Sequence, residues 1–340
     1  MRLVDALWQA VVHGDEYTAV DVVRRARADG VDEETLLQDV IAAVQERVGA
    51  EWAADRLTVA QEHAATALNE RVISGLAHYG HRRTGSGETP RGRVTVGCAD
   101  GEWHALPTRL VAEVLRLRGW RVDYLGAHTP TRHLVSHLHN TGSEAVLLSA
   151  TLPTRLPAAH AAVTACRAMG VPVMAGGRAF GPDGRHAHAL GADAWAPDAR
   201  AAAAVLDEGL PAPDPAAVRQ VVDDLPHLTD QKYTFVTRSR VPLVRQTLTG
   251  LEDRFPPLRA YGDEQRERTA EDLSHIVDFL ATALYVDGPA LFTTFLDRTA
   301  RVLEARGVPA RSVVAALGVL SHQLRDFPAR CACSGVAPPP

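Results

Sequence analysis

Residues 94–125 read VTVGCADGEWHALPTRLVAEVLRLRGWRVDYL, and this stretch decides the fold of the middle of the chain. A β-branched run is followed by a polar loop, an amphipathic helix pattern and a second apolar run. The apolar runs that we assign to strands are 94–98, 121–125, 145–148, 171–175 and 192–195. Because these short runs alternate with helical patterns, they predict a Rossmann-like or flavodoxin-like five-stranded parallel sheet over residues 93–210.

The segments on either side of this region are helical by pattern. Residues 1–80 carry four amphipathic stripes separated by turn-forming residues, which predicts a four-helix bundle. Residues 81–92 are polar and Gly-rich, as in a linker. Residues 216–328 predict an all-α domain, and 329–340 a disordered tail. The expected fold class is therefore α/β plus all-α.

Composition excludes several classes of protein. The 340 residues carry a formal net charge of −5 and show no basic recognition helix, which argues against direct binding to nucleic acid. No run of about 18 apolar residues is present, so we expect no membrane span and a cytoplasmic location. Four cysteines (Cys98, Cys166, Cys331 and Cys333) are too few and too scattered for a disulfide framework.

The loop that follows the first predicted strand contains Glu102 and His104. A carboxylate two residues before a histidine can engage one ring nitrogen and leave the other for a metal or a proton. A loop histidine is more often only solvated. However, ligands of parallel sheets bind at the carboxyl ends of the strands, and this position favours a binding site.

This loop resembles the Asp-x-His-x-x-Gly signature of cobalamin-binding domains, with Glu102 in place of the aspartate. The resemblance implies that His104 ligates cobalt from below, with Trp103 beside it in the cofactor site. Pro107 stands where the family has glycine, so hydrogen bonding to the nucleotide tail is altered there.

Two further landmarks are similar to that family. Ser149 and Thr151 follow the third predicted strand and match residues that contact the buried nucleotide tail. Gly176 and Gly177 follow the fourth strand and match paired glycines that let this tail pass close to the backbone.

Trp52, Glu62 and His63 form a second pattern, in the helical segment before the linker. The alternative is a core tryptophan and a solvated Glu-His pair. Their spacing resembles the Trp-x9-Glu-His signature of light-sensing cobalamin repressors, which bind adenosylcobalamin under a helical bundle. The resemblance implies that Trp52 packs on the adenosyl group and Glu62 hydrogen-bonds it. His63 would then become the upper cobalt ligand after light.

The C-terminal helical region resembles globin-like and phycobiliprotein-like sensor domains, so the whole chain is similar to the photocobilins, which bind cobalamin and a bilin. This implies a non-covalent site for biliverdin. His275 would contact the pyrroles, and Arg238, Arg245 and Arg268 would be partners for the propionates. The alternatives are a core or boundary histidine, solvated arginines, or His275 as a haem ligand.

These resemblances imply a photoreceptor rather than an enzyme. Light would cleave the cobalt–carbon bond of adenosylcobalamin, and the helical bundle would then shift against the sheet. The signal would pass to an unknown partner protein or to a change of state in a homo-oligomer. The main alternative is a corrinoid protein that carries methyl groups between methyltransferases, which needs His104 equally. The third hypothesis is a haem-type gas sensor.

Overall fold

The computed structural model describes residues 2–80, 91–213 and 225–325. The chain divides into two compact units, Met1–Pro226 and His227–Pro340. Most of the linker predicted at 81–92 lies outside the described residues. So does the tail predicted at 329–340, with Cys331 and Cys333.

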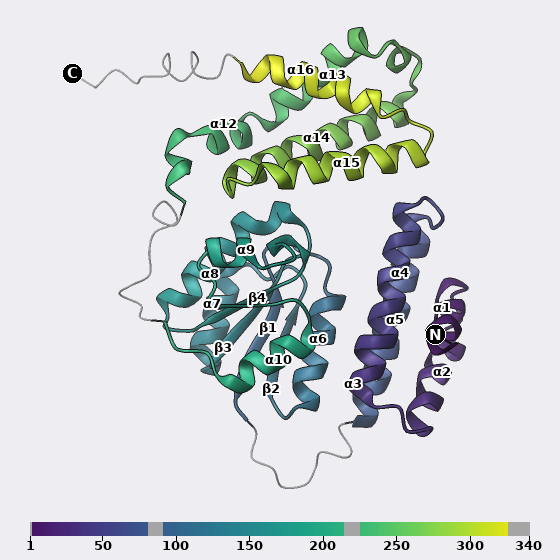
Figure 1. Cartoon of the computed structure of the whole chain (residues 1–340), viewed down its shortest axis with the longest axis vertical. Helices are drawn as coiled ribbons and strands as arrows, with labels where there is room; N and C mark the ends of the chain where they lie inside the picture. Colours follow the sequence, from purple (N-terminus) through teal and green to yellow (C-terminus); the bar gives the residue numbers. More distant parts are fainter. Residues whose placement is uncertain (1, 81–90, 214–224, 326–340) are drawn as a thin grey trace, which may run out of the picture. The chain divides into compact units, whose positions relative to one another are not determined.

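The first unit contains the predicted sheet (Figure 1). Its strands are β1 (Arg93–Cys98), β2 (Arg121–Gly126), β3 (Ala145–Ser149), β4 (Val173–Gly176) and β5 (Ala194–Ala196). All are parallel, and their order is β2-β1-β3-β4-β5. β1 and β3 are buried almost throughout, as expected for parallel strands that are covered on both faces. The flavodoxin-like class predicted from the sequence is confirmed.

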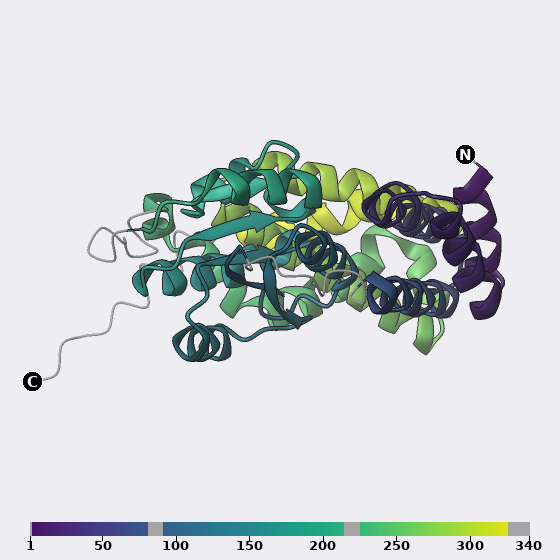
Figure 2. The ribbon, with the colours of Figure 1, turned by 90° about the horizontal axis from the view of Figure 1, so that it is seen from below.

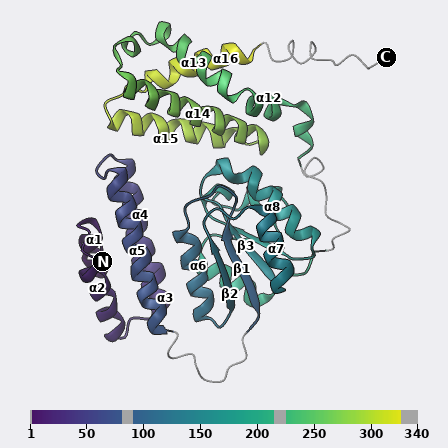
Figure 3. The same cartoon turned by 180° about the vertical axis from the view of Figure 1, so that it is seen from behind.

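Helices cover both faces of the sheet. The longer ones are α6 (Leu106–Leu117), α7 (Thr131–Thr141), α8 (Leu156–Ala168) and α10 (Ala199–Glu208). The shorter ones are η2 (Pro153–Arg155), η3 (Arg178–Phe180) and α9 (Arg185–Ala189). α6 and α10 pack together on one face, and α7 and α8 on the other (Figures 1 and 3). Because the strand order reverses at β1, the loops after β1 and β3 diverge there, where ligands of such folds bind.

Residues 2–80 form the predicted helical bundle, which we call the helical cap. Its helices are α1 (Arg2–Val12), α2 (Glu16–Ala28), a third that joins α3 (Glu33–Thr35), η1 (Leu36–Ile41) and α4 (Ala42–Ala53), and α5 (Val59–Gly80). The predicted turns end in capping residues, since Asp15 and Asp32 accept hydrogen bonds from the amides of Thr18 and Thr35. Figure 2 shows α4 and α5 nearly end-on.

The third helix of the cap departs from a regular α-helix. η1 is a π-helical stretch, and its four apolar residues are all buried: Leu36, Leu37, Val40 and Ile41. They belong to the same hydrophobic cluster as Leu110 of α6 and Leu206 of α10. The cap and the sheet domain therefore share one core.

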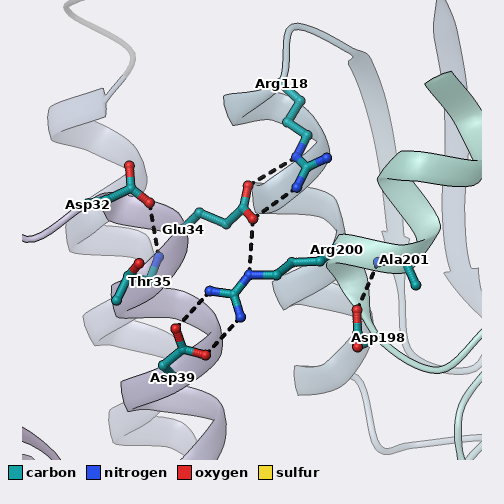
Figure 4. A network of polar contacts seen from close by, with 8 residues as sticks. All are labelled: Asp32, Glu34, Thr35, Asp39, Arg118, Asp198, Arg200 and Ala201. Atoms are coloured by element: carbon teal, nitrogen blue, oxygen red, sulfur yellow. Dashed lines mark hydrogen bonds and ion pairs between the residues drawn. The ribbon is translucent and has the colours of Figure 1, made fainter.

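An ion-pair network at the edge of this shared core also joins the cap to the sheet domain (Figure 4). Glu34 accepts hydrogen bonds from Nε and Nη2 of Arg118, at 3.0 and 2.9 Å, and from Nε of Arg200 at 3.2 Å. The second carboxylate, Asp39, accepts two hydrogen bonds from Arg200, both at 2.8 Å. Since both arginines belong to the sheet domain, this bidentate geometry fixes the cap against it.

The second unit is all-α, as predicted. Its helices are α12 (Lys232–Arg238), α13 (Arg240–Arg254), α14 (Asp263–Tyr285), α15 (Pro289–Ala305) and α16 (Arg311–Leu324), with short η5 (Pro226–Asp230) and η6 (Pro256–Ala260). α13 and α16 pack closely, because a Cβ on Gly250 would lie 2.8 Å from Cγ1 of Val319. Within the described ranges of the chain, no helix is long and apolar enough to span a membrane.

Replacing Glu34 with glutamine should lower the free energy of unfolding by about 1–2 kcal/mol, because two arginines lose their shared carboxylate. Hydrogen bonding from Arg118 outweighs burial and holds the pKa of Glu34 below its ordinary value. The stabilisation is therefore complete above the ordinary carboxylate pKa and is lost as the pH falls. Urea unfolding of wild-type and variant proteins should show a difference that shrinks below about pH 4.

Glu46→Gln is the matched control for this prediction. Its side chain is 75% exposed and lies 3.9 Å from Arg178, so we expect a change of less than about 0.5 kcal/mol. An equal effect of the two substitutions would contradict the role given to Glu34.

Candidate functional site

The loop after β1 turns tightly towards the loop after β3. The amide of Ala99 donates to the carbonyl of Ser149 at 2.9 Å, and the amide of Glu102 donates to the carbonyl of Ala99 at 2.9 Å. Gly101 has a φ of +74°, which favours glycine. This turn directs the Glu102 side chain into the protein, where it is fully buried.

Glu102 joins the two loops through four hydrogen bonds. Its Oε1 accepts from the amide of His104 at 3.0 Å and lies 2.6 Å from Nδ1 of the same residue. Its Oε2 accepts from the amides of Thr151 and Leu152 at 2.7 and 2.9 Å. Burial alone would raise the pKa of this carboxyl, but the hydrogen bonds outweigh it and lower the pKa to about 2. Glu102 is therefore ionised at neutral pH.

The His104 ring lies at the surface of the site, with 52% of its side chain exposed. Its Nδ1 is held by Glu102, and none of the described residues forms a hydrogen bond to Nε2. The bond to Glu102 raises the pKa of His104 against the opposing effect of burial, and Glu62 of the cap adds to the increase. Nε2 is the atom left for a metal ligand.

Gly176 ends β4 and Gly177 follows it. These two glycines allow the loops after β3 and β4 to contact each other. The amide of Ala150 donates to the carbonyl of Gly176, and the amide of Ala179 donates to the carbonyl of Ala150, both at 3.1 Å. Gly177 has a φ of +95°, and a Cβ there would lie 2.4 Å from the carbonyl oxygen of Ala150. Only glycine fits this position without a shift of the backbone.

The three cap residues of the predicted site lie where α4 ends and α5 begins. Trp52 is partly buried against the core of the cap. Glu62 accepts a hydrogen bond from the hydroxyl of Thr66 at 3.0 Å. His63 is 71% exposed, and its Nε2 lies 3.7 Å from the Glu62 carboxylate. The structure thus gathers Trp52, Glu62 and His63 at one end of the cap, and Glu62 lies within electrostatic reach of His104.

Large apolar side chains are exposed on both sides of this site. Val59 is exposed at the start of α5, and Leu152 and Trp103 are exposed on the loops of the sheet domain. The Trp103 ring stacks on His128, with ring centroids 5.0 Å apart and planes 12° apart. An apolar ligand would cover such surfaces. A macrocycle that brings its own metal would fit a single free histidine nitrogen in a site that also exposes large apolar side chains.

The residues predicted to bind a bilin lie on the surface of the second unit. His275, Arg238 and Arg268 are all exposed, whereas the neighbours Leu273 and Ile276 of His275 are buried. Arg268 donates to Glu264 at 2.6 Å. No contact between His275, Arg238 and Arg268 is formed in the part of the chain that the structure describes.

Three residues of the site were not predicted from the sequence. Nδ1 of His128, in the loop after β2, accepts a hydrogen bond from the amide of Gly101 at 3.0 Å. Arg155, at the end of η2, lies against Gly101. The carboxyl-end rule that drew attention to His104 applies to both loops and could have found His128 and Arg155. Gly101 was missed because its positive φ depends on the tertiary turn.

Glu102→Gln should lower the pKa of His104, because the ring loses its ionised partner. NMR titration of the ring protons in the protein without cofactor measures this, with His104→Gln to assign the signal. Asp100→Asn is the matched control. Asp100 is in the same loop as Glu102, but its carboxylate lies beside His128. An unchanged His104 titration in Glu102→Gln would refute the role of Glu102.

Gly177→Ala should reduce the free energy of unfolding by at least ~2 kcal/mol, because both the φ angle and the Ala150 carbonyl oppose a Cβ. Gly142→Ala is the matched control. Gly142 also has a positive φ, of +65°, but no atom lies within 4 Å of its Cβ position. Chemical unfolding should show a clearly larger loss for Gly177→Ala, and equal losses would exclude the close loop contact.

Known families match both the helical cap and the sheet domain. Residues 3–76 match the model of one family described as B12 binding domain, and residues 92–206 match that of a second family with the same description. The chain is 24% identical to the trimethylamine corrinoid protein of Methanosarcina barkeri over 148 residues, 44% of this chain and 68% of that protein. It is also 24% identical to trimethylamine corrinoid protein 2 of Methanosarcina mazei over 147 residues, 43% of this chain and 67% of that protein.

A solved structure shows the same fold. The monomethylamine corrinoid protein of Methanosarcina barkeri matches with a TM-score of 0.53 and 22% sequence identity, over 61% of this chain and 98% of that chain. The matched families cover both the helical cap and the sheet domain. Residues 3–76 and 92–206 therefore match B12 binding domain families, and the chain is a cobalamin-binding protein.

Proposed function

We propose that this chain is a cobalamin-dependent light sensor, in which His104 binds cobalt from below and the helical cap covers the upper face. The observation that carries the cobalt-binding part of this proposal is the His104 ring. Its Nδ1 is fixed by Glu102, its Nε2 has no partner among the described residues, and Glu62 of the cap lies within electrostatic reach. Glu102 would hold the ring in the orientation and tautomer that cobalt coordination needs.

The cap residues would contact the upper ligand of the cofactor and distinguish one such ligand from another. Adenosylcobalamin, when bound, would supply a cobalt–carbon bond that light can break. Trp52 would offer an aromatic face to the adenine, and Glu62 would accept hydrogen bonds from the adenosyl group. His63, which is largely exposed, could turn towards cobalt once that group has left. These residues would then lose their ligand contacts, and the cap would change its position or mobility.

The second candidate is a corrinoid methyl carrier, and the named relatives support it better than they support light sensing. Both candidates need His104 and Glu102, so the lower half of the site does not separate them. The cap residues above the cofactor would separate the two candidates, because a methyl group needs neither an aromatic face nor a carboxylate acceptor. Trp52 and Glu62 therefore favour a larger and more polar upper ligand.

We further propose that the second unit binds biliverdin without a covalent bond. Its described residues, 227–325, contain no cysteine that could form a thioether. Exposed Arg238 and Arg268 suit the two propionates, and Arg245 lines a groove along α13 that also includes Gln246. The haem alternative, in which His275 would be the iron ligand, stays a prediction. The output would be a protein partner or a homo-oligomer, without direct contact to nucleic acid.

The light-sensor proposal predicts a spectral and structural response after reconstitution with adenosylcobalamin in the dark. Green light should shift the visible spectrum to a stable protein-bound product and change hydrogen exchange in residues 2–80. His104→Ala should abolish the protein-bound spectrum. Trp52→Ala and Glu62→Gln should weaken binding of adenosylcobalamin about tenfold more than binding of methylcobalamin.

Tyr17→Phe is the matched control, because this cap tyrosine is 90% exposed and lies in α2. A response no different from that of free cofactor, with equal effects of Trp52→Ala on both cobalamins, would favour the methyl carrier. Biliverdin added to the same sample should give a red absorption band. Persistence of this band on the chain in a denaturing gel would contradict non-covalent binding.

A further inference from the structure

Arg155 differs from the other half-buried arginines of the first unit because it has no carboxylate partner. The others, with their partners, are Arg27 (Glu33), Arg93 (Asp123), Arg109 and Arg116 (Glu113), Arg118 and Arg200 (Glu34), and Arg167 (Asp193). No carboxylate of the described residues lies within 4 Å of the Arg155 guanidinium. Its Nε is buried and has no hydrogen-bond partner. Such a group is costly unless a ligand completes it.

The position of this cation is defined by the cobalt-ligand loop. A Cβ on Gly101 would lie 2.8 Å from Nη1 and 3.3 Å from Cζ of Arg155, so the guanidinium packs directly on this glycine. Arg155 thus lies where the loops after β1 and β3 meet, next to the cobalt ligand.

Neither nearby carboxylate pairs with Arg155. Glu102 accepts four hydrogen bonds from His104, Thr151 and Leu152, none of them from Arg155. Asp100 lies beside His128, and none of its carboxylate oxygens lies within 4 Å of the Arg155 guanidinium. A bound anion would complete the contacts of this guanidinium.

We propose that Arg155 binds the phosphodiester of the nucleotide tail of cobalamin. This inference rests on the proposed binding of cobalt by His104, which would bring the lower face of the corrin and its tail to these two loops. The phosphodiester is the anionic group of the cofactor, whereas the side chains of the corrin ring are neutral amides. A guanidinium offers several N–H donors and a permanent positive charge, which match phosphate oxygens.

Arg155 is then a specificity-determining residue that distinguishes complete cobalamin from corrinoids without a phosphate. It does not act on cobalt, so its contribution should be independent of the lower ligand. Arg155→Gln removes the charge and keeps much of the side-chain volume, and Arg155→Lys keeps the charge but loses the planar donor set.

Equilibrium binding of three probes tests this inference: cobalamin, cobinamide phosphate, and cobinamide, which lacks the whole nucleotide. Arg155→Gln should weaken binding of cobalamin and cobinamide phosphate about tenfold or more, and leave cobinamide unchanged. Arg155→Lys should recover part of the loss. Arg132→Gln, an exposed arginine at the start of α7, should change none of the three affinities.

The outcomes separate the two proposals. Equal weakening of all three probes would mean that Arg155 only supports the loop, and unchanged binding of all three would remove any role in binding; either result overturns the inference while cobalamin binding by His104 stands. If the wild-type protein binds none of the probes, the proposed function fails and the inference fails with it. Thermal unfolding of each variant establishes that the fold is kept.

Discussion

The buried carboxylate of Glu102 is the interaction on which the site depends. A fully buried carboxylate is tolerated only when donors fill its lone pairs. Here the donors are three backbone amides and the imidazole of His104. The same bonds that keep it ionised also hold the His104 ring at a fixed angle and tie the loop after β1 to the loop after β3. The orientation of the candidate cobalt ligand is therefore a property of the sheet as well as of its own loop.

Strand order makes this arrangement possible. β1 pairs with β3, so the loops after these two strands start side by side at the same edge of the sheet and can be bridged by one side chain. The cap is attached to the same domain through Glu34 and the shared core. Glu34 and Trp52 are 18 residues apart on the third helix, or roughly 27 Å at 1.5 Å per residue. One continuous helix thus links the anchored edge of the cap to the end that faces the site.

The sequence predicted the parts of this structure that depend on local periodicity. The alternation of short strands and helices, the four helices of the cap and the engagement of His104 by Glu102 were all expected from pattern and spacing. The π-helical stretch at η1 was not, because its apolar residues also fit a regular helix. Arg155 was missed for a different reason: what distinguishes it is a missing partner, and this becomes visible only when the surroundings of every other half-buried arginine are known.

The contacts of the upper ligand, rather than the charge around the metal, bear on the choice between the two functions. Glu102 holds His104, and Glu62 raises the pKa of His104 from the cap side. Negative charge near cobalt would oppose reduction of the metal in both functions, because transfer of a methyl cation leaves two electrons on cobalt and homolysis of a cobalt–carbon bond leaves one. The charge of the two carboxylates therefore does not separate the sensor from the carrier. The residues that would separate them are Trp52 and Glu62, through their contacts with the upper ligand.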